Sequence, residues 1–317
     1  MAKSKIQVCI VSGCESSLVR NVEEIIASVN SSVNVQTVSW DGLDKLDKYQ
    51  LGVLIIGSGE ENMALEFSRD VSPFHRKLIP VLPSETTLET VVEFLQLDDV
   101  DQILRREFTW ESNLRALMLV LFTGAIFGME KYLSEKDEVS YLRFKDYQGR
   151  QLVLDKVRDV ARDMGLRRIR REHAVQAAEE LVMNALYNAP REEDGNMMFG
   201  NIDPHKRVNM DSPKPVSLRY SETQEGLYMA VRDRFGALDK KTVLAYISKC
   251  LYSKEQIDRK TIGAGLGIYL TIRRVQSYIV NVAPNIATEV IISLKQTKEI
   301  GVPAVIAFFE YSSGSEQ

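Results

Sequence analysis

A carboxylate and an amide, Glu180 and Asn184, are spaced four residues apart in the segment 173–190. Apolar residues recur in this segment at helical spacing and Pro190 ends it, so we predict a helix there. Both side chains then project from one face, one turn from each other. The carboxylate could deprotonate an attacking hydroxyl or water while the amide oxygen binds magnesium. The alternative is a chance pair of surface residues with a weak contact.

Asp233 and a glycine-rich segment add two further groups that suit a nucleotide. A hairpin is predicted around Glu225 and Gly226, and Asp233 ends its second strand just before a glycine turn. A carboxylate in that position can accept a hydrogen bond from an exocyclic amine such as that of adenine. Farther along, the glycines of segment 263–267 lead into an apolar helix, which lets backbone N–H groups approach phosphate oxygens. No Walker A lysine follows, and a lone GxGxG is weak support.

These features in this order, ExxxN, then Asp with glycine, then GxGLGI, resemble the Bergerat-fold ATPases of the GHKL superfamily over about residues 135–298. The resemblance implies ATP and Mg²⁺ as cofactors, with Glu180 as the catalytic base and Asn184 as the metal ligand. The ATP site that it implies is made of Asn184, Asn188, Asp233, Gly236, Leu238, Gly263, Gly265, Leu266, Gly267 and Thr288.

The same resemblance implies a role for each end of the site. Asp233 would bind the adenine amino group, Thr288 would support the adenine site, and Asn188 would neighbour the phosphates. The glycines with Leu266 would close a lid over the phosphates. One departure is visible: the glycine positions of the family's DxGxG motif are Phe235 and Ala237 here, which alters the expected shape of the adenine pocket but leaves its aspartate.

Within the superfamily, the run GAGLGIYLTIRRV and the paired helices before Glu180 most resemble the anti-sigma-factor serine kinases. That resemblance implies a protein partner, either an anti-anti-sigma antagonist of the STAS type or a sigma factor, with no direct nucleic acid and no membrane, and it leaves a homodimer open. Two alternatives remain: a non-catalytic module in which ATP orders a docking surface, and a histidine-kinase-like phosphotransfer protein. The latter lacks support because His75, His173 and His205 are not in the required upstream dimerisation helix.

The first part of the chain, about residues 5–114, alternates short apolar runs with amphipathic stretches. This pattern predicts a doubly wound parallel α/β sheet, and its element order resembles a response-regulator receiver domain. The receiver's acidic pair, phosphoacceptor and lysine fall on Ser12, Gly13, Ile56 or Gly57, and Arg106. Because the acids are missing, we expect a pseudo-receiver used for docking or dimerisation. An unrelated flavodoxin-like domain is the alternative.

Length and composition set the frame for these motifs. The 317 residues are 44% hydrophobic and 26% charged, which predicts a folded chain, and a length of this size favours two domains. The net charge of -4 excludes a globally basic nucleic-acid binder. Three cysteines without a zinc motif, and no signal-peptide pattern, predict the cytoplasm. We expect a pseudo-receiver at 1–115, a connecting helix at 116–135 and an α+β Bergerat-fold sandwich at 136–317.

Overall fold

The computed structural model describes residues 7–12, 16–40, 51–71, 77–107, 109–200, 202, 206, 210–252, 265–295 and 301–311. The chain divides into two compact units, residues 1–125 with 304–307 and residues 126–303 with 308–317. The protein is mixed α/β. In the first unit the strands hydrogen-bond in the order β2-β1-β3-β4-β5-β11, and in the second unit in the order β9-β10-β8-β7-β6. The sequence gave no sign that a late strand, β11 (Val305–Glu310), pairs antiparallel with β5 of the first unit.

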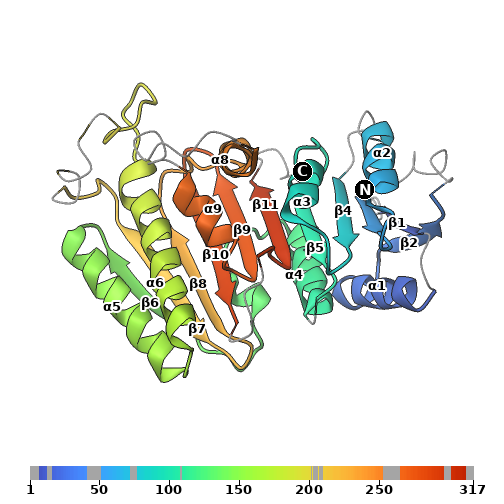
Figure 1. Cartoon of the computed structure of the whole chain (residues 1–317), viewed down its shortest axis with the longest axis horizontal. Coiled ribbons are helices and arrows are strands. Elements are labelled where there is room, and N and C mark those ends of the chain that lie inside the picture. The colour runs from blue at the N-terminus through green and yellow to red at the C-terminus, as the bar shows by residue number, and fades with distance from the viewer. Residues whose placement is uncertain are drawn as a thin grey trace. The chain divides into compact units, whose positions relative to one another are not determined.

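The first unit has the parallel strands that the sequence predicts (Figure 1). Every residue of β3 is buried, as expected for a parallel strand that is covered on both faces. Helix α1 packs against α4, and α2 packs against α3. The elements are β1 (Gln7–Ser12), α1 (Ser16–Val29), β2 (Asn34–Val38), β3 (Leu51–Ile55), α2 (Glu61–Val71), β4 (Lys77–Leu82), α3 (Leu88–Leu95), β5 (Gln102–Arg105) and α4 (Trp110–Thr123).

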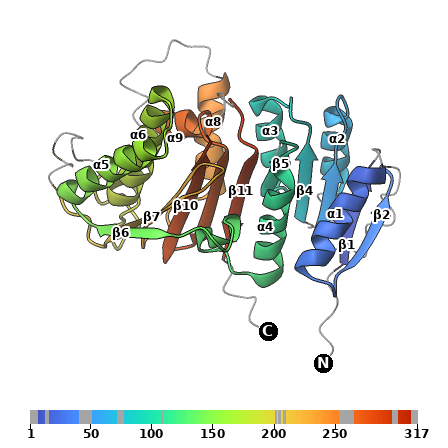
Figure 2. The ribbon, with the colours of Figure 1, turned by 90° about the horizontal axis from the view of Figure 1, so that it is seen from below.

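The second unit pairs its strands β6 to β10 antiparallel, with helices over one face (Figure 2). Helix α6 packs against α5, α9, β8 and β10. The elements are the 3₁₀ helix η3 (Met129–Tyr132), β6 (Ser140–Phe144), α5 (Tyr147–Asp163), α6 (Arg168–Met183), the π-helix η4 (Asn184–Asn188), β7 (Val216–Glu222), β8 (Leu227–Arg232), α8 (Lys240–Tyr252), α9 (Leu266–Ile272), β9 (Ser277–Ala283) and β10 (Ala287–Leu294).

Gly149 lies in the first turn of α5, directly after β6. The helix begins here because the Asp146 side chain caps it, accepting a 2.7 Å hydrogen bond from the Gly149 N–H. A Cβ at Gly149 would lie 2.4 Å from the Phe144 Cβ, so the glycine serves close packing between strand and helix.

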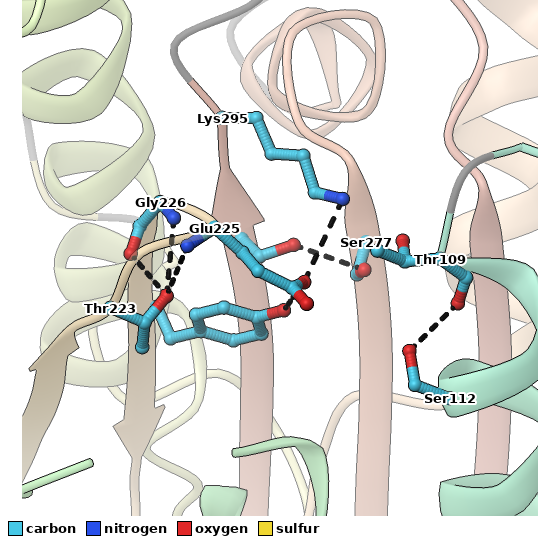
Figure 3. Close-up of polar contacts among 9 residues, drawn as sticks. Thr109, Ser112, Thr223, Glu225, Gly226, Ser277 and Lys295 are labelled. Atoms are coloured by element: carbon cyan, nitrogen blue, oxygen red, sulfur yellow. Dashed lines mark hydrogen bonds and ion pairs between the residues drawn. The ribbon is translucent and has the colours of Figure 1, made fainter. Parts of the chain in front are cut away.

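The predicted hairpin around Glu225 and Gly226 is confirmed: a turn there joins β7 to β8 (Figure 3). The Thr223 hydroxyl accepts hydrogen bonds from the backbone N–H groups of Glu225 and Gly226, both at 3.1 Å. Gly226 has φ +150, and a Cβ there would lie 2.1 Å from the carbonyl oxygen of Leu294. The Lys295 ammonium lies 3.7 Å from the Glu225 carboxylate. Only glycine fits this close approach of the turn to the end of β10.

Among the described residues, no helix has both the length and the apolar character that crossing a membrane requires. The apolar residues that follow Ala116 belong to α4, which ends at Thr123. Gly124 follows in the left-handed conformation and ends the helix, and Ala116, Leu117, Met118 and Val120 are buried.

Candidate functional site

Three side chains on one helix face form a continuous chain of hydrogen bonds. The Asn184 amide Nδ2 donates to Glu180 Oε1 at 3.0 Å, and the Asn188 Nδ2 donates to Asn184 Oδ1 at 2.7 Å. Glu180 lies in α6, whereas Asn184 begins the π-helical turn η4. In this turn the Ala189 N–H donates to the Asn184 carbonyl at 2.8 Å, five residues back. Single π turns of this kind are frequent at functional sites, and the sequence gave no sign of this one.

The environment of Glu180 favours its protonated form. Burial is the largest cause and raises the pKa of the Glu180 carboxyl above its usual range. The hydrogen bond from Asn184 partly offsets that rise, and the neighbouring Glu179 carboxylate adds to it. A carboxylate whose pKa is moved toward neutral is a better general base at neutral pH.

The glycine-rich segment meets this carboxylate at Gly267. A Cβ built on Gly267 would lie 1.8 Å from Glu180 Oε2 and 2.1 Å from its carboxyl carbon, so the backbone at the start of α9 packs directly on the Glu180 side chain. Any residue other than glycine would displace the carboxylate. Two motifs that are far apart in the sequence therefore meet at one carboxylate.

The rest of the glycine-rich segment is described only in part. Gly265 precedes α9 with φ +108, and a Cβ there would lie 2.4 Å from the Tyr246 ring. Leu266 is the first residue of α9 and is half-buried. Gly263, predicted to belong to the same lid, lies outside the described residues.

Asp233 lies directly after β8 and is joined to Thr288 at the second residue of β10. Asp233 Oδ1 accepts hydrogen bonds from the N–H groups of Phe235 at 2.7 Å, Gly236 at 3.3 Å and Thr288 at 3.3 Å. Its own N–H donates to the Thr288 carbonyl at 2.9 Å. The structure thus brings together two residues that the sequence assigned to one adenine site.

The Asp233 carboxyl is 5% exposed, and burial raises its pKa to about 6. The three backbone N–H groups and the charge of Arg191 lower the pKa and leave a net increase. The Thr288 hydroxyl next to it is 2% exposed, and its oxygen has no hydrogen-bond partner within the described part of the chain. A buried, unsatisfied hydroxyl beside a buried carboxyl is a pair of groups that a polar ligand or a water would complete.

Gly236 allows the turn that follows Asp233. It has φ +67, and a Cβ there would lie 2.2 Å from the Ala283 carbonyl and 2.6 Å from the Asn285 nitrogen. In this turn the residue that must be glycine is therefore Gly236. Phe235 is 8% exposed, and the Lys214 ammonium lies 5.0 Å from its ring centre. Leu238 is half-buried in the segment between β8 and α8.

The two groups of residues share the helix-covered face of the sheet. Side chains alternate along a strand, so Asp233 and Thr288 face opposite to their neighbours Arg232 and Glu289. Helix α6, which contains Glu180, packs on β8 and β10. The Glu180 charge also acts on Tyr278 of β9, where it adds to the burial that raises the pKa of that phenol.

Arg191 was not predicted from the sequence as part of the site. This residue follows η4, and its guanidinium donates to the Ala189 carbonyl at 3.1 Å. Its charge lowers the pKa of Asp233, so it lies within electrostatic reach of the carboxyl. Its position, three residues after Asn188, was the available signal, but a single arginine in a proline-containing loop does not stand out in a sequence.

The receiver-like positions of the first unit lie where parallel strands end. Ser12 ends β1, and Ile56 and Gly57 follow β3. The Arg106 guanidinium donates to the Ile56 carbonyl at 2.9 Å, and the Gly57 N–H donates to Glu60 Oε2 at 2.8 Å. Gly13 lies outside the described residues. Arg106, at the position that the sequence predicts for a receiver's lysine, thus donates to the backbone at the position predicted for the phosphoacceptor.

Among the described residues, no group of three or more His, Cys, Asp and Glu side chains could bind a metal ion. A magnesium ion in this unit would therefore need ligands from outside that set. The Asn184 amide oxygen is one candidate, since it has two lone pairs and accepts one hydrogen bond, from Asn188. Phosphate oxygens of a nucleotide would supply the others, as is usual for Mg²⁺.

Comparison with known proteins assigns the chain to no family. No protein-family model matches it, and no curated protein matches it. One matching solved structure is a fungal multi-domain GH3 β-N-acetylglucosaminidase, described for its GCN5-related glucosamine N-acetyltransferase region. The sequence identity is 11% and the TM-score is 0.29, and the match covers 73% of this chain and 24% of that chain. The chain spans about a quarter of that protein's length, and a likeness this weak supports neither a fold nor a function.

Proposed function

We propose that the second unit is a Bergerat-type domain of the GHKL superfamily that binds ATP with Mg²⁺. The observation that supports this most is the packing of Gly267 on the Glu180 carboxylate, because it joins the glycine motif to the acidic helix. The pairing of Asp233 with Thr288 on the same helix-covered face adds the third motif. A chance match of three short patterns would have no reason to place all three on one face of one sheet.

At the base end of the site, Asp233 and Thr288 would bind adenine. Asp233 accepts the hydrogen bond of the exocyclic amine, and the unsatisfied Thr288 hydroxyl completes the contact, directly or through a water. Gly236 allows the chain to turn against Ala283 and so fixes the Asp233 carboxyl beside β10. The donors to Asp233 Oδ1 are all backbone groups, so its orientation is independent of the ligand.

At the phosphate end, Asn184 would bind the magnesium ion and Asn188 would lie beside the phosphates. The Glu180–Asn184–Asn188 chain of hydrogen bonds orients both amides. Bound ATP supplies the phosphoryl group, and Mg²⁺ supplies positive charge against the phosphate oxygens. Glu180 would accept the proton of an attacking hydroxyl, a role that its raised pKa suits.

The activity that fits these roles is phosphorylation of a serine on a regulatory protein, as in the anti-sigma-factor kinases. The partner would be an anti-anti-sigma antagonist of the STAS type or a sigma factor, and the reaction would take place in the cytoplasm. The first unit would act as a pseudo-receiver for docking or dimerisation. This role fits the hydrogen bond from Arg106 to the Ile56 carbonyl, at a position where a receiver that takes a phosphoryl group would have a carboxylate.

One observation favours a second candidate, a non-catalytic module in which ATP binding orders a docking surface. Both oxygens of Glu180 are engaged: Oε1 accepts from Asn184, and Oε2 lies against Gly267. An attacking hydroxyl would have to displace or share one of these contacts to reach the carboxylate. A histidine phosphotransfer role has less support, since His173 is 7% exposed within α6. His75 and His205 lie outside the described residues.

The test is a phosphoryl-transfer assay with labelled Mg-ATP and STAS-type and sigma-factor partners, run on wild type, Glu180→Gln and Asp233→Asn. A kinase predicts transfer by wild type, about 10²–10⁴-fold slower transfer by Glu180→Gln with ATP binding kept, and no ATP binding by Asp233→Asn. Wild type that binds ATP but transfers to no partner identifies the non-catalytic module. Wild type that binds no ATP rejects both proposals.

A further inference from the structure

The opposite face of the second unit's sheet, away from α6, has a groove of about 680 Å³. It is not part of the proposed ATP site, because Asp233 and Thr288 face the helices. Its lining is rich in arginine and includes Tyr141, Arg143, Arg219, Arg232, Arg234 and Glu289. These residues come from β6, β7, β8, the segment after β8, and β10.

The strand register sets how far apart the charges lie. Arg143 pairs with Ser217, Ser217 with Arg232, and Arg232 with Glu289, so one row crosses four strands. Arg219 lies in the next row, opposite Tyr141. Neighbouring strands are about 4.8 Å apart, so the backbones at Arg143 and Arg232 are separated by roughly 10 Å. The arginines thus leave the sheet at several separate positions across the groove.

Of the four arginines in the lining, one forms an ion pair with a carboxylate of the described residues. Arg219 forms an ion pair with Glu130. The Arg232 guanidinium stacks on the Phe127 ring, 4.1 Å from its centre. Within the described part of the chain, no ion pair joins Arg143, Arg232 or Arg234 to a carboxylate.

Glu289 is the other acidic residue of the groove, and one of its carboxylate oxygens already accepts hydrogen bonds from the protein. It is 1% exposed, and its Oε2 accepts hydrogen bonds from the Gly128 N–H at 2.7 Å and from Asn281 Nδ2 at 3.1 Å. With four arginines in the lining against Glu289 and the Glu130 partner of Arg219, the groove keeps an excess of positive charge. The ligand that complements it is therefore acidic.

The spread of the arginines favours an acidic peptide. Their backbones extend over roughly 10 Å, so a segment with several carboxylates can bind more of them at once than a single phosphate can, and side chains on one side of an extended peptide recur about every 6.8 Å. Exposed apolar side chains flank the charges: Tyr141 is 57% exposed and Ile286 is 64% exposed. A second copy of this face is disfavoured, because a two-fold pairing would set arginines against arginines.

We propose that this groove binds an extended acidic segment of a partner protein, one that carries both carboxylate and apolar side chains on the side that faces the groove. The carboxylates bind Arg143, Arg232 and Arg234, and the apolar side chains pack on Tyr141 and Ile286. This goes beyond the proposed ATP site and lies on the other side of the sheet from it, so either site could exist without the other.

The test is fluorescence anisotropy of a labelled peptide that alternates pairs of Glu with pairs of Tyr, so that each side of the extended chain carries both residue types, titrated with the full chain at low and at physiological ionic strength. The comparison peptide has Gln in place of every Glu. The variants are Arg143→Glu and Arg232→Glu. The matched control is Arg168→Glu, on a side chain that is 87% exposed at the start of α6, away from the groove. Circular dichroism shows whether each variant is folded.

We expect the Glu peptide to bind at least about tenfold more tightly than the Gln peptide, more weakly as salt rises, and about tenfold more weakly to Arg143→Glu. Arg168→Glu should bind as wild type does. Arg143 lies on an exposed strand, so its variant remains informative even if Arg232→Glu loses its fold. Equal binding of both peptides, equal loss in the Arg168→Glu control, or displacement of the peptide by inorganic phosphate at similar concentration would each overturn the proposal.

Discussion

Replacing Asp233 by asparagine should make the protein more stable at neutral pH while abolishing its proposed binding of ATP. The reason is the raised pKa of this buried carboxyl, about 6 against an ordinary value of 3.8. The folded chain holds the proton more tightly than the unfolded chain does. The free energy of unfolding that this group contributes therefore falls as the pH rises from about 4 to about 6, and stays low above that.

The size of the effect follows from the pKa difference. A shift of about two units corresponds to about 3 kcal/mol of unfolding free energy that wild type loses between low and neutral pH. Asparagine has no charge to bury, and its oxygen still accepts from the Phe235, Gly236 and Thr288 N–H groups. Because its new Nδ2 needs an acceptor, we expect Asp233→Asn to gain about 1–3 kcal/mol at pH 7 and little at pH 4.

The assay is urea unfolding followed by circular dichroism at both pH values, for wild type, Asp233→Asn and the control Asp155→Asn. Asp155 is 60% exposed on α5, so its substitution should shift stability by no more than about 0.5 kcal/mol at either pH. A stability difference between wild type and Asp233→Asn that is the same at pH 4 and pH 7 would refute the reasoning. So would a loss of stability at pH 7, since it would mean that the charged carboxylate stabilises the fold.

The remaining predictions concern the glycines and the unsatisfied hydroxyl. Gly236→Ala should cost about 2–5 kcal/mol of unfolding free energy, because it adds left-handed strain to a clash with the Ala283 backbone; Gly165→Ala, with φ +71 and no atom within 4 Å, should cost only about 1–2 kcal/mol in the same urea assay. Gly267→Ala should displace the Glu180 carboxylate and abolish phosphoryl transfer, and unchanged transfer would contradict that contact. Thr288→Val should leave stability within about 1 kcal/mol, since its hydroxyl has no partner among the described residues, yet weaken ATP binding about tenfold by calorimetry.

The elements of the first unit could be predicted well because their signal is local. Short apolar runs such as Leu51–Ile55 are buried along their whole length, and a doubly covered parallel strand must have that composition. The helix with Glu180 and Asn184 was also predictable, from its periodicity. Its π-helical turn was not, because five-residue hydrogen bonding leaves no pattern in residue types.

Features that depend on pairing between distant segments were out of reach of the sequence. The antiparallel pairing of β11 with β5 has no local signal, so β11 was assigned to the second domain. The arginines of the groove are spread over three strands and the segment after β8, and only the strand register gathers them on one face. By contrast, the contact between Asp233 and Thr288 was expected, because the resemblance to the Bergerat-fold ATPases assigned both residues to one adenine site. Their spacing in the sequence alone did not predict it.

Calorimetric titration of the full chain with ATP, with and without Mg²⁺, tests the central claim most directly. The account predicts saturable binding of one nucleotide per chain that weakens when Mg²⁺ is removed, that Asp233→Asn abolishes, and that Asp155→Asn leaves unchanged. Absence of binding to the wild-type chain, or equal affinity in wild type and Asp233→Asn, would contradict it.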